Sequence, residues 1–210
     1  MARNLEPRCK QCRRAGEKLL LKGDRCASVK CGAVRRNYPP GQHGQARKSR
    51  PTEYGTQLRQ KQKVRKIYGL MERDFRHLIE RANVLPGDVN QNIISLLERR
   101  LDNVVYRLGF ATSRNQARQF VRHGHIRVNG RKCTVPSQLV SPNHEVAIER
   151  TNGTSATPFE EISKRWKQQK TPTWLVRSDS DFAGKVTSNP ETDQLSQAYR
   201  IPLIVEFYSR

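Results

Sequence analysis

Four of the five cysteines lie close together near the start of the chain, and thiolates are ligands that structural zinc prefers. They form two close pairs separated by a spacer of thirteen residues: Cys9, Cys12, Cys26 and Cys31. Two such pairs can surround one ion tetrahedrally, so the spacing predicts one structural Zn²⁺ with no open position for catalysis. Two disulfides also fit the count, but the N-terminus lacks the apolar core of a secretion signal, which favours a soluble, reducing compartment. Free structural thiols are the remaining alternative.

A large excess of lysine and arginine is the second chemical signal. The chain has 40 basic and 19 acidic side chains in 210 residues, a formal net charge of +21. Such an excess is usually explained by a polyanionic partner. Residues 1–50 hold 14 basic and 3 acidic side chains, whereas residues 151–210 hold 8 and 7. The polyanion is therefore expected to contact the first two thirds. No apolar run approaches the roughly 20 residues of a membrane span, so no membrane association is predicted.

The most regularly spaced arginines follow a strongly amphipathic segment. Apolar residues recur at steps of three and four from Ile94 to Leu108, which predicts one helix. Asp102 on this helix is expected to pair with a neighbouring arginine rather than to be catalytic. Ser113 can cap a second helix. Three arginines recur at steps of four along the face of that helix that we expect to be solvated: Arg114, Arg118 and Arg122.

A small antiparallel sheet is predicted directly after these helices. Gly124 ends the second helix, residues 125–128 alternate as a strand does, and Asn129-Gly130 is a strong hairpin signal. Return strands are expected at 131–135 and 145–148, and Cys133 there is expected to be a small buried apolar residue. A helix pair with a basic ridge beside such a sheet is a compact surface for the backbone of folded RNA.

The chain resembles the bacterial-type small-subunit ribosomal protein S-four family at three places. The RNA-binding module named after that family is matched by Ser113-Arg114, Ala117-Arg118, Val121 and the run from Gly124 to Gly130. The string Tyr-Pro-Pro-Gly-Gln-His-Gly at 38–44 and the ending Ile-Val-Glu-Phe-Tyr-Ser-Arg are the other two. The resemblance covers essentially the whole chain. It implies direct, early binding to small-subunit ribosomal RNA, with a role in assembling the subunit body and in translational accuracy.

The expected fold is α+β, with a helical domain, an inserted RNA-binding module of two helices plus a small antiparallel sheet, and an N-terminal zinc-knuckle extension. We expect the extension and its basic linker at 1–44, the helical domain at 45–93 completed by 175–210, and the module at 94–174. The linker is rich in proline and glycine and should be extended. A short amphipathic helix is expected around 159–166, and the apolar tail at 201–208 is expected to be an edge strand packed on an earlier element.

The residues predicted to bind RNA are basic or carry rings that can stack on bases. They are Arg13, Arg14, Arg35, Arg36, Tyr38, His43, Arg47, Lys48, Arg50, Lys61, Arg65, Arg114, Arg118, Arg122, His123, His125, Arg127 and Arg131. No catalytic residue is predicted, and a contact with the messenger path is the alternative to arginine pairing for Asp102. The alternative function is an RNA-modifying enzyme or other RNA-binding factor that carries the same module, but little length remains for a catalytic domain. The resemblance also implies ribosomal proteins S-five and S-three as neighbours, contact with messenger RNA in some members, a cytoplasmic ribosomal location and no homo-oligomer.

Overall fold

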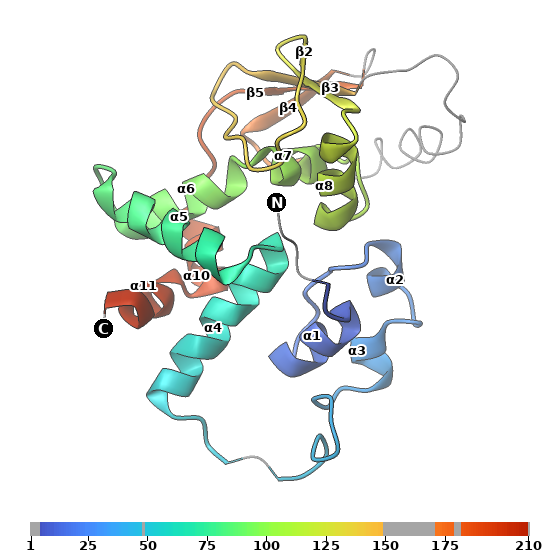
Figure 1. The fold of residues 1–210 in the computed structure, drawn as a ribbon, viewed down its shortest axis with the longest axis vertical. Helices are drawn as coiled ribbons and strands as arrows, with labels where there is room; N and C mark the ends of the chain where they lie inside the picture. The colour runs from blue at the N-terminus through green and yellow to red at the C-terminus, as the bar shows by residue number, and fades with distance from the viewer. Residues whose placement is uncertain (1–4, 48, 149–170, 179–181, 210) are drawn as a thin grey trace. The chain divides into compact units, whose positions relative to one another are not determined.

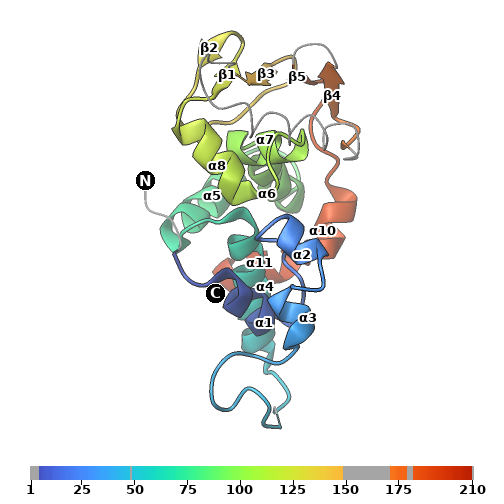
Figure 2. The ribbon, with the colours of Figure 1, turned by 90° about the vertical axis from the view of Figure 1, so that its right-hand side faces the viewer.

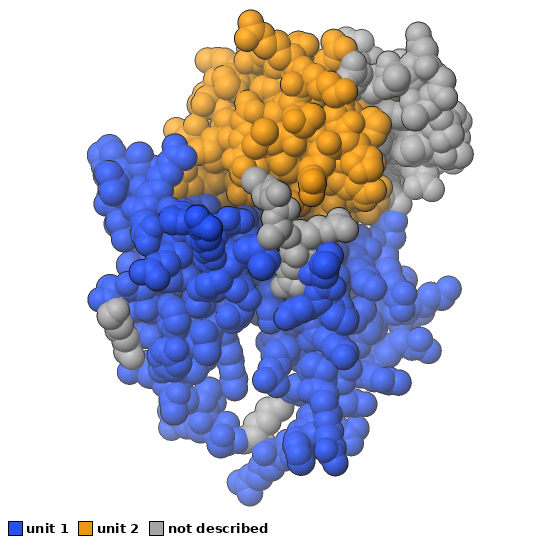
Figure 3. Space-filling model, in the orientation of Figure 1, with its two compact units in different colours: residues 1–93, 193–210 blue, residues 94–192 orange. Residues whose placement is uncertain are grey.

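The computed structural model of the chain describes residues 5–47, 49–148, 171–178 and 182–209. The chain forms two compact units, one of residues 1–93 with 193–210 and the other of residues 94–192 (Figure 3). The predicted α+β class is confirmed, because helices are joined by a small antiparallel sheet (Figure 1). Lys48 and the helix expected around 159–166 lie outside the described residues. Within the described part of the chain, no helix has both the length and the apolarity to cross a bilayer.

Two long helices, α4 (Glu53–Tyr68) and α5 (Glu72–Val84), carry the core of the first unit. Thr52 caps α4, because its Oγ1 accepts a hydrogen bond from the Gly55 amide at 3.1 Å. The helix ends at Gly69, whose φ of 66° is left-handed and suits glycine. Val64 and Phe75 are fully buried between the elements of this unit.

Three short helices precede α4 in the same unit: α1 (Arg8–Ala15), α2 (Asp24–Ala27) and α3 (Gly32–Arg35). α1 ends at Gly16 with a φ of 80°. An ion pair of 2.8 Å between Lys63 Nζ and Glu17 Oε1 connects the segment after α1 with α4. The N-terminal extension is therefore ordered on the first unit rather than separate from it.

The C-terminal tail is a helix, so the predicted edge strand is wrong. α10 (Asp193–Tyr199) leads into α11 (Ile201–Ser209), which packs along α4 (Figures 1 and 2). Pro202 lies in the first turn, where a helix needs no hydrogen-bonded amide. Ile201 and Ile204 lie on the same side of the helix and are fully buried. Burial of this stripe outweighs the strand preference of the tail's β-branched and aromatic residues.

The single helix predicted over 94–108 is two helices, α6 (Val89–Glu98) and α7 (Leu101–Arg107). Between them Arg100 has an extended backbone, with ψ 136°, and forms an isolated bridge with Leu139. The Leu101 amide also donates to the carbonyl of Gln138 at 2.8 Å. These contacts with a distant loop interrupt the helix, although the predicted apolar positions are all buried.

The second unit contains α7, α8 and a five-stranded antiparallel sheet in the order β2-β1-β3-β5-β4. α8 (Arg114–Arg122) is followed by β1 (Ile126–Val128), β2 (Arg131–Lys132), β3 (Glu145–Ile148), β4 (Leu175–Ser178) and β5 (Ala183–Val186). The predicted hairpin is confirmed, because Asn129 and Gly130 have φ of 50° and 76°, as a type I′ turn requires. The return strand is shorter than predicted.

β4 and β5 extend this unit beyond the expected module end at 174, because they complete its sheet. Residues 175–192 therefore belong with the sheet, and only 193–210 return to the first unit. Gly184 on β5 lies against the Leu108 side chain so closely that a Cβ there would overlap Leu108 Cδ1 and Cδ2. A glycine at this position lets the strand pack directly on the end of α7.

Candidate nucleic-acid interface

The three regularly spaced arginines of α8 have different environments. Ser113 caps the helix as predicted, and its Oγ accepts from the Gln116 amide at 3.3 Å. Arg122 is exposed, but Arg118 is only 8% exposed and lies 3.5 Å from Asp102. The prediction that all three face solvent is therefore wrong for Arg118. The reason is that α8 packs on α7, whose buried carboxylate attracts this guanidinium.

Arg114 is held in place by two neighbours on α7. Its Nε donates to Asn103 Oδ1 at 2.8 Å, and its guanidinium carbon lies 4.6 Å from the centroid of the Tyr106 ring. The side chain is half-buried, and these two contacts fix the orientation of its guanidinium. A pre-oriented arginine loses less conformational freedom when it meets a phosphate.

Buried acids around α7 organise these arginines. Asp102, 4% exposed, accepts from Arg100 Nε at 3.1 Å and Nη2 at 2.9 Å, which confirms the predicted pairing with a neighbouring arginine. Glu98 is fully buried and accepts from Asn103 at 2.9 Å and from both Nε and Nη2 of Arg107. The acids hold the basic helix pair together, since a buried charge needs a hydrogen-bonded partner.

Sequence reasoning missed Glu98 and Asn103. Glu98 could have been found from its position, because it lies among the apolar residues of a helical stripe and next to several arginines. A charged side chain that is buried in this way is almost always paired, here with an arginine. Together with Asp102, Glu98 and Asn103 connect α6, α7 and α8 through side chains.

The N-terminal linker is attached to α1 by Arg13. Its Nε donates to the Tyr38 carbonyl at 2.9 Å, its Nη2 donates to the Pro39 carbonyl at 3.2 Å, and its guanidinium carbon lies 4.8 Å from the Tyr38 ring centroid. A Cβ on Gly44 would overlap the Pro39 carbonyl oxygen, so the turn closes on itself. These two predicted RNA-binding residues, Arg13 and Tyr38, thus contact each other, and their role in RNA binding stays a prediction.

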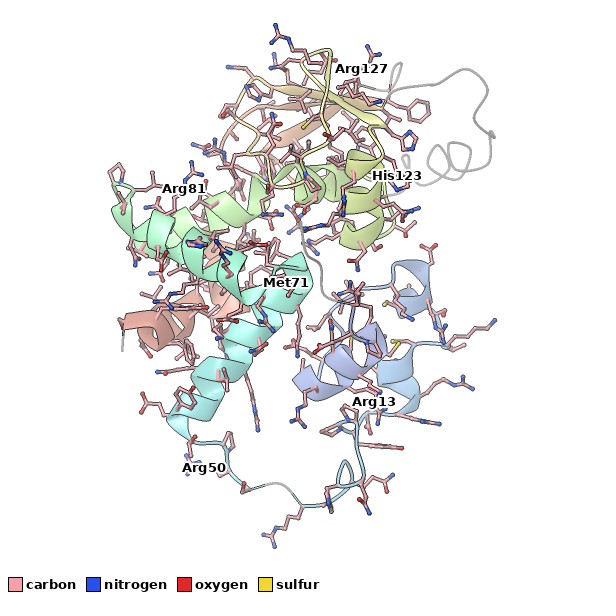
Figure 4. All side chains as sticks on the ribbon, viewed as in Figure 1. Arg13, Arg50, Met71, Arg81, His123 and Arg127 are labelled. Carbon is pink, nitrogen blue, oxygen red and sulfur yellow. The ribbon has the colours of Figure 1, made fainter. Side chains whose placement is uncertain are left out.

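The other predicted residues of this segment are exposed. They are Arg14, Arg35, Arg36, His43, Arg47 and Arg50. Figure 4 labels Arg13 on α1 and Arg50 at the far end of the linker, and shows further basic side chains along the segment. The exposed set is strongly basic.

Lys61 and Arg65 anchor the C-terminal tail and are not displayed on a solvated face. Lys61 is 6% exposed, lies 2.6 Å from Glu72 Oε1 and is 4.3 Å above the Phe207 ring. Arg65 Nη1 lies 2.8 Å from Glu72 Oε2, and the Tyr208 hydroxyl donates to Oε1 at 2.8 Å. Lys61 is therefore held inside the first unit, and its role in RNA binding stays a prediction.

The pKa values of the cluster reflect these contacts. Burial opposes ionisation of Glu72, but hydrogen bonds from Lys61 and Tyr208 and the charges of Lys61 and Arg65 hold its pKa below the usual value. Burial, followed by the hydrogen bond to Glu72, raises the pKa of Tyr208. The stable form is therefore a carboxylate that accepts from a neutral phenol and two cations.

Acidification is expected to weaken tail docking. Because the folded pKa of Glu72 is depressed, its contribution is fully present above the unfolded pKa of about 4.3 and is lost as pH falls through the lower folded value. Glu72→Gln should cost about 1 kcal/mol at pH 7, since the side chain is 44% exposed and partly screened, and less at pH 3. Thermal melting followed by circular dichroism at both pH values measures this. An equal cost at pH 3 and pH 7 would contradict it.

The four N-terminal cysteines lie near one another in the first unit. Cys12, Cys26 and Cys31 are buried, Cys9 is half-buried, and none forms a disulfide. Burial raises the pKa of the Cys12 thiol, a backbone hydrogen bond at Leu19 lowers it, and the other three thiols raise it further. The Lys22 amide donates to Cys26 Sγ at 3.3 Å, a contact that suits a sulfur carrying negative charge.

The four thiols are near one another, but they are not arranged as the ligands of a bound metal ion. Among the residues that the structure describes, no three His, Cys, Asp or Glu side chains are arranged so that they could hold a metal ion. The donor set is the one that zinc prefers, since it consists of four cysteines on neighbouring short elements. The zinc ion stays a prediction. Cys133 is buried as predicted, with its Sγ 2.8 Å from Gln138 Oε1.

The remaining predicted residues lie where α8 meets the sheet. His123 follows α8, His125 precedes β1, and Arg127 and Arg131 are exposed on β1 and β2. Lys132 was not predicted, yet it lies directly opposite Arg127 across the hairpin. The position of Lys132 could have been predicted, because the Asn129-Gly130 turn fixes the register that places it opposite Arg127. Two like charges at directly opposed positions repel each other.

Comparisons with known proteins match both units. Residues 3–98 match the family described as Ribosomal protein S4/S9 N-terminal domain, and residues 99–146 match the S4 domain. Small ribosomal subunit protein uS4 of Halothermothrix orenii is 50% identical over 210 residues, covering 100% of both chains. Proteins of the same name from Desulforamulus reducens and Syntrophomonas wolfei are 50% and 47% identical over the same span.

Proposed function

Because this chain belongs to the uS4 family of small ribosomal subunit proteins, we propose that it binds small-subunit ribosomal RNA directly and is a structural constituent of that subunit. In this role it helps to fold the body of the subunit early in assembly, contributes to translational accuracy, and works in the cytoplasm. The alternative, an RNA-modifying enzyme with the same module, is not favoured, because the relatives that match the entire chain are named as ribosomal proteins.

The observation that carries the proposal is the set of exposed cations on the N-terminal segment. It comprises Lys10, Arg14, Lys18, Lys22, Arg25, Lys30, Arg35, Arg36, Arg47 and Arg50, all exposed. Cations held on short helices and a closed turn can neutralise phosphates where RNA helices converge, with release of counterions. Recognition is of shape, since the deep groove of A-form RNA hides its base edges.

Removing four cations from the linker is expected to weaken RNA binding selectively. The linker variant is Arg35→Ala, Arg36→Ala, Arg47→Ala and Arg50→Ala. Affinity for a transcript of the 5′ domain of small-subunit ribosomal RNA should fall by about tenfold or more, because log K depends on log salt with a slope of about −0.9 per phosphate contact. Filter binding at several salt concentrations measures both affinity and slope.

A variant of equal charge change serves as the control for this test. It carries Arg59→Ala, Arg73→Ala, Arg76→Ala and Arg81→Ala, four exposed positions on α4 and α5 (Arg81 is labelled in Figure 4). Equal losses in the two variants, or no preference of the unaltered protein for the transcript over duplex RNA of the same length, would contradict the proposal. The charge would then act as a non-specific coat.

We also propose that Cys9, Cys12, Cys26 and Cys31 hold one structural zinc ion. Their spacing and their proximity in the first unit support this. The ion would cross-link α1, α2 and α3, which have little apolar core of their own. Purified protein is expected to contain about one zinc per chain by elemental analysis. Cys26→Ser should lose zinc and lower the melting temperature, whereas Cys133→Ser should keep zinc. Full zinc content in Cys26→Ser would contradict the ligand set.

The neighbours implied by the family are part of the same proposal. We place S-five, S-three and messenger RNA near this chain in the assembled subunit, on the strength of the resemblance. Photocrosslinking from position 47, on the exposed linker, and from position 206, on the exposed side of α11, would capture them in purified subunits. Crosslinks to none of the three from either position would contradict it. The protein is not proposed to form homo-oligomers.

A further inference from the structure

Three aromatic rings gather where α8 ends and β1 begins. The rings of Phe120 and His125 have centroids 6.2 Å apart and are nearly perpendicular, at 87°. The rings of His123 and His125 have centroids 6.0 Å apart at 41°. His123 is exposed and the other two are half-buried. Figure 4 shows His123 at the end of α8. His123 is therefore the most exposed ring of the group, and His125 contacts both it and Phe120.

Basic side chains stand beside these rings. Lys132 crosses from β2 over Gly124, which separates the two histidines, and a Cβ on Gly124 would overlap Lys132 Cε. Gly124 also has a φ of 76°, so it suits both the turn and the passage of the lysine. Lys132 in turn lies opposite Arg127 in the hairpin, and both are exposed. Directly opposed side chains of a hairpin lie on one face and near each other, so both cations can contact a single phosphate.

We propose that this junction binds one unpaired nucleotide of RNA, with its base stacked on the His123 and His125 rings and its phosphate held by Lys132 and Arg127. The inference rests on the proposed RNA-binding function and adds to it a contact of a different kind. A base can stack on any aromatic face, and cations at the rim of the rings can bind the phosphate of the same nucleotide. An RNA duplex cannot occupy the site in this way, because its bases are already stacked on each other.

The test compares single-stranded with duplex RNA on the full-length protein. The probes are a twelve-nucleotide oligoadenylate, a duplex of twelve base pairs, and the 5′-domain transcript. His123→Ala is expected to weaken oligoadenylate binding by about fivefold or more, the lower end of what one stacked base contributes, with less than about twofold change on the duplex. His123→Tyr should retain most of the affinity, because it keeps a flat ring. Lys132→Ala should weaken binding to both probes.

His77→Ala is the matched control, since His77 is an exposed histidine on α5 that contacts Glu80. It should leave all affinities unchanged. Equal losses on oligoadenylate and duplex in His123→Ala would overturn the stacking proposal and leave only a phosphate contact. No loss on either probe, or failure of His123→Tyr to restore binding, would also overturn it. The transcript separates the two proposals. If the protein binds the transcript strongly and selectively, and His123→Ala does not change that binding, the nucleotide site is refuted while the proposed function stands.

Discussion

Replacing Asp102 with alanine is expected to lower the free energy of unfolding of the second unit by about 3–5 kcal/mol. The carboxylate is 4% exposed and is shared by Arg100, 2.9 Å away, and Arg118, 3.5 Å away. Its removal leaves two buried guanidiniums without the charge that compensates them. Both tryptophans of the chain, Trp166 and Trp174, lie within residues 94–192. Urea unfolding followed by tryptophan fluorescence therefore reports on this unit.

Glu145→Ala is the control for Asp102, because it removes an exposed acid from the same unit and should change stability by no more than about 0.5 kcal/mol. The double variant Asp102→Ala with Arg118→Ala should cost less than the sum of the single variants, since the two side chains contact each other. A cost below about 1 kcal/mol for Asp102→Ala would show that the ion pairs of Asp102 do not hold α7 and α8 together.

Loss of the tail helix is expected to have the other large effect, on the first unit. Ile204 is fully buried against the unit's long helices, and Ile204→Ala should cost about 2–5 kcal/mol as a core truncation. A chain that ends at Tyr199 also loses Ile201, Tyr208 and the ring over Lys61. We expect this shorter chain to unfold its first unit at room temperature, because single domains have only about 5–15 kcal/mol of stability.

Circular dichroism at 222 nm reports mainly on this unit, because it holds most of the described helical residues, while tryptophan fluorescence checks that the second unit stays folded. Ser209→Ala removes an exposed side chain from the same helix and should leave the melting curve unchanged. If the chain ending at Tyr199 melted at the same temperature as the full chain, the docking of α11 on α4 would not stabilise the unit.

The parts of the fold that could be predicted from the sequence are those that depend on interactions between residues close together along the chain. Ser113 and the Asn129-Gly130 turn act over a few residues, and both were predicted from their neighbours and confirmed. The tail was misjudged because its strand preference is a local quantity, whereas the burial that outweighs it depends on α4, more than 130 residues away. The break at Arg100 has the same origin, since the bridge to Leu139 is not visible in the helical spacing.

For the candidate interface, the sequence by itself determined the sign and the distribution of the charge, the cysteine spacing and the positions of the helix caps. These depend on residue types and on spacing along the chain. Only the tertiary structure decided which cations face solvent. Arg118, Lys61 and Arg65 belong to the same basic pattern as Arg122 and Arg35, yet the first three pair with Asp102 and Glu72 and are at least half-buried. The reason is physical: a charge is displayed or buried according to whether folding brings a carboxylate to it, and periodicity does not contain that information.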